Sequence, residues 1–195
     1  MLVKITFTEE LLGTASANPA IHHEFIASKA PDAPSTEEEV AALGVEAVEK
    51  DCMTVFPKED GKAFLWDYQV KGFFKDACGC LRRVPGSKSA ALKAHKKVID
   101  GLVFVMPRKI FLGLPKGGAI GNCQRSLRAE TAQGPRIALA NSETVPEGSS
   151  LEFEVRILDD ELEKTVKEWL EYGALRGLGQ WRNSGKGRFT VEYLG

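Results

Sequence analysis

Residues 177–188 read Gly-Leu-Gly-Gln-Trp-Arg-Asn-Ser-Gly-Lys-Gly-Arg, a loop with two Gly-x-Gly pairs and three basic residues. Residues 162–175 before it carry apolar side chains at helical spacing, and residues 188–193 after it alternate as a strand does. A dinucleotide-binding fingerprint needs a glycine where Arg182 stands, and a phosphate-binding P-loop needs Ser or Thr where Gly187 stands. Both motifs also lead into a helix, whereas this loop leads into a strand. The pattern therefore excludes these two nucleotide sites.

The chemistry of this loop suits an anionic strand. Glycines tolerate positive φ and let backbone N–H groups approach an anion closely. The basic side chains add charge, and the indole of Trp181 offers a face on which a base can stack. The alternative is a helix C-cap and turn whose glycines only satisfy geometry. The candidate RNA contacts here are Arg176, Gly177, Gly179, Trp181, Arg182, Gly185, Lys186, Gly187 and Arg188.

A second basic element is the helix expected to end before Pro85. Apolar residues recur at i, i+3, i+4, i+7 and i+11 from Val70, which places them on one face and buries Phe73 and Phe74. Basic residues at the same period occupy a different face. These are Lys71, Lys75 and Arg82. We expect this cationic stripe to face phosphates.

The elements outside these two stretches complete a recognisable order. Further strands are expected at residues 2–8, 102–107, 110–112 and 151–157. Without the segments expected to be insertions, the order of elements is strand, helix, strand, strand, helix, strand. That order predicts an α+β, ferredoxin-like (RRM-like) βαββαβ core with an antiparallel sheet and two helices on one face. We expect one domain over residues 1–195, with insertions at about 13–55 and 86–141 and a two-stranded excursion at 123–141.

Charge is strongly segregated along the chain, although the net charge is only −1. Residues 1–60 carry a net charge of −8, residues 61–136 of +11, residues 137–171 of −7 and residues 172–195 of +3. A fold that joins the second and fourth blocks would present a basic face on a nearly neutral molecule. The alternative is a solvated surface on which the segregation has no role.

The glycine loop resembles that of the RAMP superfamily, the RNA-binding and RNA-processing proteins of CRISPR systems. The shared pattern is Gly-x-Gly-x5-Gly-x-Gly between the second helix and the last strand. Asp-Gly-Lys-Ala-Phe-Leu-Trp-Asp-Tyr-Gln-Val-Lys-Gly at 60–72 is similar to the stretch that opens an RNA-facing helix in the effector backbone subunits, with Trp-Asp-Tyr-Gln replacing the family's P-G-S-S. Residues 143–148, Glu-Thr-Val-Pro-Glu-Gly, resemble the turn before that branch's last helix. The short chain looks like a compact phage or prophage member.

The resemblance implies binding of single-stranded RNA through its phosphate backbone, in a CRISPR-related or phage context. A different class of function is a protein-interaction module that engages or mimics subunits of a CRISPR-like assembly, with an anti-defence role. The acidic blocks favour this alternative, because opposed charged faces could drive stacking into a homo-oligomer.

An endoribonuclease is the third reading. RAMP nucleases use a histidine near the first helix as general base, a position that His22 and His23 approximate, and the backbone branch uses an aspartate for which Asp32 is the counterpart. No complete catalytic set, metal-ligand set or cofactor motif is present, so we expect a binder rather than an enzyme, with no metal and no cofactor.

Cysteine usage and hydropathy indicate a cytoplasmic protein. The four cysteines have neither a disulfide framework's pattern nor the spacing of a structural zinc site. No apolar run approaches the roughly 20 residues of a membrane helix. The first residues read as a strand rather than a signal peptide.

Overall fold

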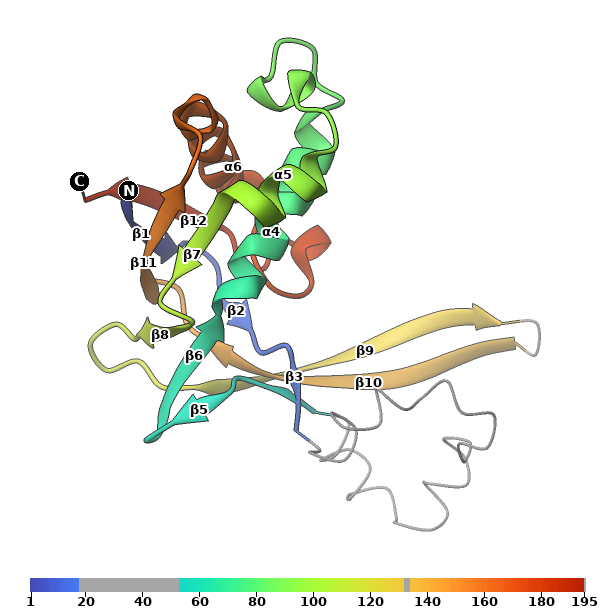
Figure 1. Ribbon diagram of the computed structural model, residues 1–195. Coiled ribbons are helices and arrows are strands. Elements are labelled where there is room, and N and C mark those ends of the chain that lie inside the picture. The colour runs from blue at the N-terminus through green and yellow to red at the C-terminus, as the bar shows by residue number, and fades with distance from the viewer. Residues whose placement is uncertain (18–52, 132–133, 195) are drawn as a thin grey trace, which may run out of the picture. The chain divides into compact units, whose positions relative to one another are not determined.

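The computed structural model describes residues 1–17, 53–131 and 134–194, apart from some side chains of the long strands. The chain divides into two compact units (Figure 1). Unit 1 comprises Met1–Leu11, Pro57–Ala119 and Val145–Gly195, and unit 2 comprises Leu12–Phe56 and Ile120–Thr144. None of the helices in the described ranges combines the length and apolar character needed to cross a bilayer.

Unit 1 contains the expected ferredoxin-like core. Its elements are β1 (Leu2–Phe7), α4 (Asp67–Leu81), β7 (Val103–Met106), β11 (Ser150–Ile157), α6 (Glu163–Arg176) and β12 (Phe189–Tyr193). The strands lie in the order β12-β1-β11-β7, and each neighbouring pair is antiparallel. The predicted βαββαβ fold is confirmed.

The sheet is wider than the predicted four strands. β8 (Lys109–Gly113) follows β7 along the same edge of β11, with Leu112 opposite Leu151. β6 (Lys62–Trp66) pairs with β8, and β5 (Lys58–Glu59) forms a hairpin with β6. Among the described residues these strands bring the sheet to seven, because β5 and β6 form before α4 and β8 follows β7.

The core forms between the sheet and two helices, as the apolar spacing predicts. Phe73 and Phe74 of α4 are both buried, and the Phe74 ring lies 5.8 Å from that of Trp169 on α6. Phe189 of β12 packs under α6, where a Cβ on Gly173 would come within 2.0 Å of its ring. Glycine at this position is therefore required for the helix to approach the strand.

Helix α4 begins at Asp67, three residues before the apolar pattern starts. The Gln69 side chain reaches back and its Oε1 accepts a hydrogen bond of 2.8 Å from the Trp66 N–H. The Asp67 N–H donates to the carbonyl of Arg108 on the way into β8, at 3.0 Å. Capping of these early N–H groups stabilises the first turn.

The chain between α4 and β7 forms two short helices that the sequence pattern did not predict. They are η1 (Lys88–Ala91) and α5 (His95–Leu102). The Glu168 carboxylate of α6 accepts hydrogen bonds from the Lys88 N–H at 2.7 Å and the Ser89 hydroxyl at 2.7 Å. Trp169 Nε1 also donates to Ser89 Oγ, at 2.8 Å. These contacts, of which the Trp169–Ser89 hydrogen bond is buried, hold η1 against α6.

Unit 2 is built on a long β-hairpin. Strands β9 (Gly121–Thr131) and β10 (Gly134–Val145) pair antiparallel over their whole length, which confirms the predicted two-stranded excursion. Three strands of two residues complete its sheet in the order β2-β10-β4-β3. These are β2 (Leu11–Leu12), β3 (Ala15–Ser16) and β4 (Thr54–Val55).

Candidate nucleic-acid interface

The basic face predicted on α4 is present, and its first two lysines meet α5. The Lys75 ammonium lies 2.6 Å from the Asp100 carboxylate, and Lys71 Nζ donates to the Asp100 carbonyl at 3.0 Å. The hydrogen bond from Lys75 is the main reason that the pKa of Asp100 lies below its ordinary value of 3.8. The Asp100 carboxylate also lies 4.0 Å from Lys71 Nζ, so one carboxylate serves two lysines, which leaves excess positive charge.

Arg82 lies at the end of this face and contacts His95, the first residue of α5. Arg82 Nη1 lies 3.0 Å from His95 Nδ1. Because a guanidinium only donates, Nδ1 accepts and the proton of the neutral ring sits on Nε2. Partial burial, followed by the charges of Arg82 and Lys96, lowers the pKa of His95 below 6.5. At neutral pH this ring offers an N–H donor without adding charge.

A hollow of about 610 Å³ lies where α4 and α5 meet. We call it the basic hollow, and it is lined by Lys75, Asp76, Gly79, Cys80, Arg82, Arg83, His95 and Lys96. Four of these residues are cationic and one is acidic. Such a surface favours a phosphate group over a neutral or cationic ligand.

Asp76, the one acid of the hollow, joins α4 to the glycine-rich loop. Its carboxylate accepts hydrogen bonds from Arg176 Nε at 2.9 Å and from Arg182 Nη1 at 2.6 Å. Burial raises the pKa of Asp76, but the hydrogen bonds and charges of the two arginines outweigh it and hold the pKa below 3.8. Helix α4 and the glycine-rich loop, which are distant in sequence, are therefore adjacent. The negative charge of Asp76 between them is already balanced by the two arginines.

The four glycines of the loop all have positive φ, from 69° to 85°. The N–H groups of Gly177, Gly185 and Gly187 donate to Gly173, Arg182 and Glu10 carbonyls, at 2.9 to 3.0 Å. A Cβ on Gly187 would lie 1.9 Å from the Leu178 carbonyl oxygen, which only glycine avoids. The amide contacts to an anion expected at these three glycines are therefore not available, since the glycines shape the loop.

The other predicted loop residues have mixed surroundings. The Lys186 ammonium forms an ion pair with Glu10. Arg188 is exposed, and its carbonyl accepts a hydrogen bond from the Thr8 N–H at 2.8 Å. Trp181 is half-buried in the left-handed conformation, with φ 52°. The arginine side chains, rather than the glycine amides, are thus what this loop contributes to a charged surface.

Sequence reasoning missed the residues that organise this surface. Asp76, His95 and Asp100 were not predicted to contact the basic stripe, although Asp76 and Asp100 are two of only four acids in the +11 block and so carried a signal. His22, His23 and Asp32 lie outside the residues that the structure describes. Within the described ranges, no group of three His, Cys, Asp or Glu side chains could hold a metal ion.

Comparison with known proteins shows the fold. The chain matches a subunit in the cryo-EM structure of type III-B Cmr-beta bound to cognate target RNA, with a TM-score of 0.53 and 13% identity over 98% of this chain. It spans 58% of the length of that subunit. A chain of a type IV-B CRISPR complex matches with a TM-score of 0.46, 12% identity and coverage of 98% of this chain and 88% of the other. No protein-family model and no curated protein matches.

The Cmr-beta chain is a subunit of a CRISPR complex. At 13% identity the similarity concerns the architecture alone, and it agrees with the βαββαβ order of unit 1.

Proposed function

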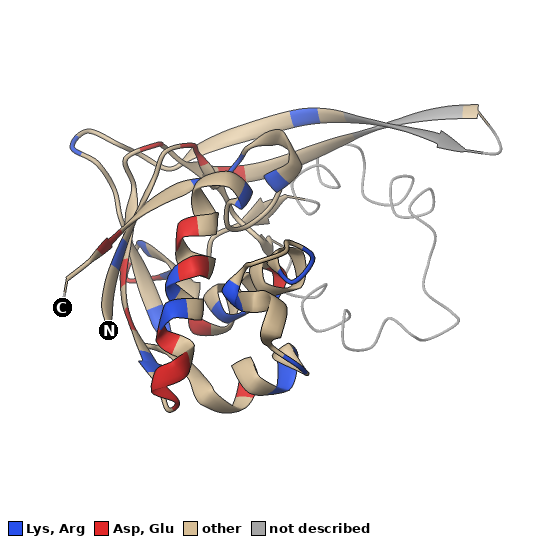
Figure 2. Ribbon diagram, turned by 90° about the horizontal axis from the view of Figure 1, so that it is seen from above, with Lys and Arg blue, Asp and Glu red and all other residues tan. Residues whose placement is uncertain are grey.

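We propose that the chain is a RAMP-like protein that binds the phosphate backbone of single-stranded RNA in a CRISPR-related or phage context. The observation that carries the proposal is the basic hollow, in which Arg82, Arg83 and Lys96 surround an acid already paired with two arginines. An unbalanced cluster of this kind attracts a polyanion and releases its counterions. Figure 2 shows the basic positions (blue) on the helices and connecting loops among acidic ones (red), so the attraction is local.

The side chains define how a phosphate would be held. Arg83 and Lys96 are exposed and can move onto a phosphate oxygen. The His95 Nε2–H adds a neutral donor. The contact reads no base, so affinity from this hollow is expected to be largely independent of RNA sequence.

Binding of labelled single-stranded RNA, double-stranded RNA and single-stranded DNA tests the proposal by fluorescence polarisation. Lys96→Ala is expected to weaken RNA binding several-fold. Lys164→Ala is the matched control, because Lys164 is also an exposed helical lysine but lies outside the hollow. Equal affinity of both variants and the unchanged protein would contradict the proposal.

A protein-interaction module is the second candidate, and one surface favours it. A groove of about 900 Å³ beside β7 and β11 is lined in part by the exposed side chains of Leu2, Phe104 and Leu158. Exposed apolar patches of this kind are typical of subunit contacts. Light scattering in the absence of RNA separates the candidates: a ring or filament supports assembly, and a monomer counts against it.

Cleavage of the RNA is checked on the same samples by gel electrophoresis. His22, His23 and Asp32 remain the candidates for this chemistry. Intact RNA after prolonged incubation would remove the endoribonuclease alternative.

A further inference from the structure

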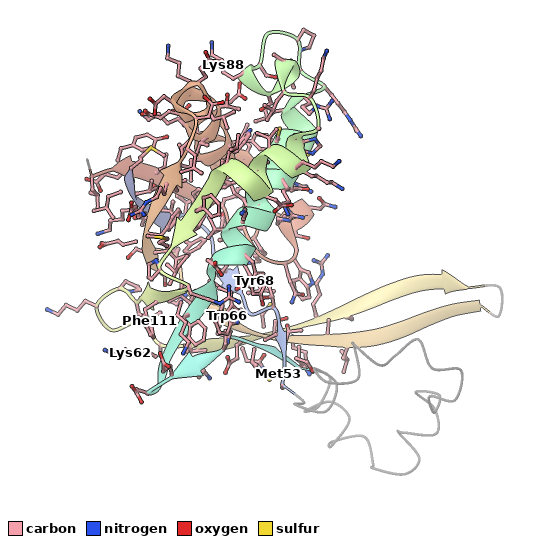
Figure 3. All side chains as sticks on the ribbon, in the orientation of Figure 1. Met53, Lys62, Trp66, Tyr68, Lys88 and Phe111 are labelled. Carbon is pink, nitrogen blue, oxygen red and sulfur yellow. The ribbon has the colours of Figure 1, made fainter. Side chains whose placement is uncertain are left out.

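Four aromatic rings follow one another where β6 and β8 meet the start of α4. Figure 3 labels three of these residues, Trp66, Tyr68 and Phe111. Phe64 and Phe111 lie 5.8 Å apart between ring centroids, Phe64 and Trp66 5.0 Å, and Trp66 and Tyr68 6.2 Å. We call these four residues the aromatic ladder. Trp66 and Tyr68 are nearly parallel, with 14° between their planes, so both present ring faces in one direction.

The fold holds this ladder on rigid backbone. Phe64 and Phe111 are directly opposite each other in the antiparallel pairing of β6 with β8, which places both side chains on one face of the sheet. Trp66 is fixed by the hydrogen bond from its N–H to Gln69, in the first turn of α4. Because the aromatic ladder is carried on two strands and the first turn of a helix, it loses little conformational freedom when it binds a ligand.

Two of the rings are exposed. Phe64 is 4% exposed and anchors the ladder, whereas Phe111 is 43% and Tyr68 54% exposed. Burial of two more rings would be favourable for a protein that used them only for folding. Their exposure leaves both rings accessible to a ligand.

Cations accompany the rings. The Arg108 guanidinium lies 5.5 Å from the centroid of the Trp66 ring, and Lys109 Nζ lies 5.6 Å from that of Phe64. Arg108 also forms an ion pair of 3.4 Å with Asp67, and Lys109 forms one with Glu59. Exposed ion pairs contribute at most about 1 kcal/mol, so each cation can exchange its carboxylate for a phosphate.

A series of side-chain contacts leads from the ladder to the basic hollow. Arg108, which lies over Trp66, lines the 900 Å³ groove together with Phe104. Lys71 lies 4.8 Å from the Phe104 ring and shares Asp100 with Lys75, which lines the hollow. A single strand that follows α4 would meet all of these groups over about 20 Å, at 1.5 Å of rise per residue.

We infer that the aromatic ladder stacks unpaired bases of the RNA whose phosphates lie in the basic hollow. This inference rests on the proposed RNA binding and adds a contact to the bases. Exposed aromatic rings interleaved with cations are the chemistry that proteins use to hold single strands. A duplex, whose bases are already stacked, gains nothing from the ladder.

The test compares two ligands on the unchanged protein and two variants. The ligands are an oligouridine strand and a strand of the same length whose backbone carries no bases. Tyr68→Ala combined with Phe111→Ala is expected to weaken oligouridine binding by about five- to one-hundred-and-fifty-fold, as loss of stacking does for one base. Binding of the base-free strand is expected to stay unchanged. Tyr193→Ala is the matched control, because Tyr193 is 37% exposed with Lys167 Nζ 5.3 Å from its ring, but lies on β12. It is expected to bind both strands as the unchanged protein does.

The outcomes separate this inference from the proposed function. Unchanged oligouridine binding in the Tyr68/Phe111 variant would contradict base stacking on the aromatic ladder. An equal loss of affinity for both strands would contradict it too, because the base-free strand has nothing to stack. A protein that binds neither strand contradicts the proposed function itself. A ladder that serves a protein partner would also leave oligouridine binding unchanged.

Tryptophan fluorescence provides a second measurement, and it does not require the Tyr68/Phe111 double variant to fold. In a Trp181→Phe protein the remaining indoles are Trp66 and Trp169, and Trp169 is fully buried. Stacked bases are expected to quench Trp66, while the base-free strand is not. Equal emission in the presence and absence of saturating oligouridine would contradict the ladder.

Discussion

Asp76 is the residue through which the helix and the loop of the proposed interface are joined. Its carboxylate binds Arg176 and Arg182, and it lies on the helix that carries Lys71 and Lys75. The cations themselves could be predicted, because helical period and glycine spacing are local properties of sequence. Their acidic partners could not, because Asp76 is about a hundred residues from the arginines it binds and only the tertiary fold sets that distance.

Asp76→Asn is expected to lower the free energy of unfolding by about 1 kcal/mol, the range for a partly exposed ion-pair network. The folded pKa of Asp76 lies below the ordinary 3.8, so the unfolded state binds more protons as the pH falls through this range. The stabilisation is therefore complete above pH 3.8 and is lost as the pH falls through the lowered pKa. Thermal unfolding of both proteins over a pH series measures this. A difference that persists unchanged in strong acid would contradict it.

His95 is expected to stay neutral until the solution is acidic, because burial and its two cationic neighbours lower its pKa. RNA affinity should change little from pH 8 down to 6.5, and should rise below 6.5 as the ring gains charge next to phosphate. Polarisation assays over this range provide the measurement. His95→Gln serves as the control and should lose only the rise in acid; an identical rise in the variant would assign it to another group.

At the scale of elements, periodic helices and strands were predictable, whereas the two short helices η1 and α5 were not. Helix α4 and strand β11 follow clear apolar periods, and both were expected. Helix α5 was missed because it has only eight residues, begins after Ala94 in the left-handed conformation and has no side-chain cap. Its stability comes from the buried Ile99 and from lysines of α4 that bind Asp100, which are tertiary contacts.

The glycine-rich loop supplies the prediction at this scale. Gly187→Ala combines a left-handed φ of 69° with a Cβ 1.9 Å from the Leu178 carbonyl oxygen, so the two sides of the loop must separate. We expect it to lower the free energy of unfolding by at least about 3 kcal/mol. Gly86→Ala is the control: its φ is 83° but no atom lies within 4 Å of the added Cβ, so the loss should be about 1 kcal/mol.

Chemical denaturation measures both losses. Equal destabilisation by the two substitutions would show that the close approach inside the loop is not present in solution.

At the scale of the whole molecule, the charge blocks of the sequence have a structural counterpart. Arg176 and Arg182 of the +3 block meet Asp76 of the +11 block, and the basic hollow lies beside this contact. The order of strands and helices predicted this meeting only in outline, because His95 and Lys96 of the unexpected helix α5 supply part of the hollow's lining. A near-zero net charge therefore conceals a local field.

That field sets the salt dependence of binding. Each phosphate neutralised on a single strand contributes about 0.7 to the slope of log affinity against log salt concentration. Removal of two hollow cations, Arg83→Ala with Lys96→Ala, should lower the slope by about 1.4 if each cation contacts one phosphate. Lys116→Ala with Lys164→Ala removes the same charge from exposed positions outside the hollow and should leave the slope unchanged. The net charge falls equally in the two double variants. Equal slopes would therefore assign binding to the overall charge and not to the hollow. A lower slope in the Arg83/Lys96 variant alone would place phosphates between α4 and α5.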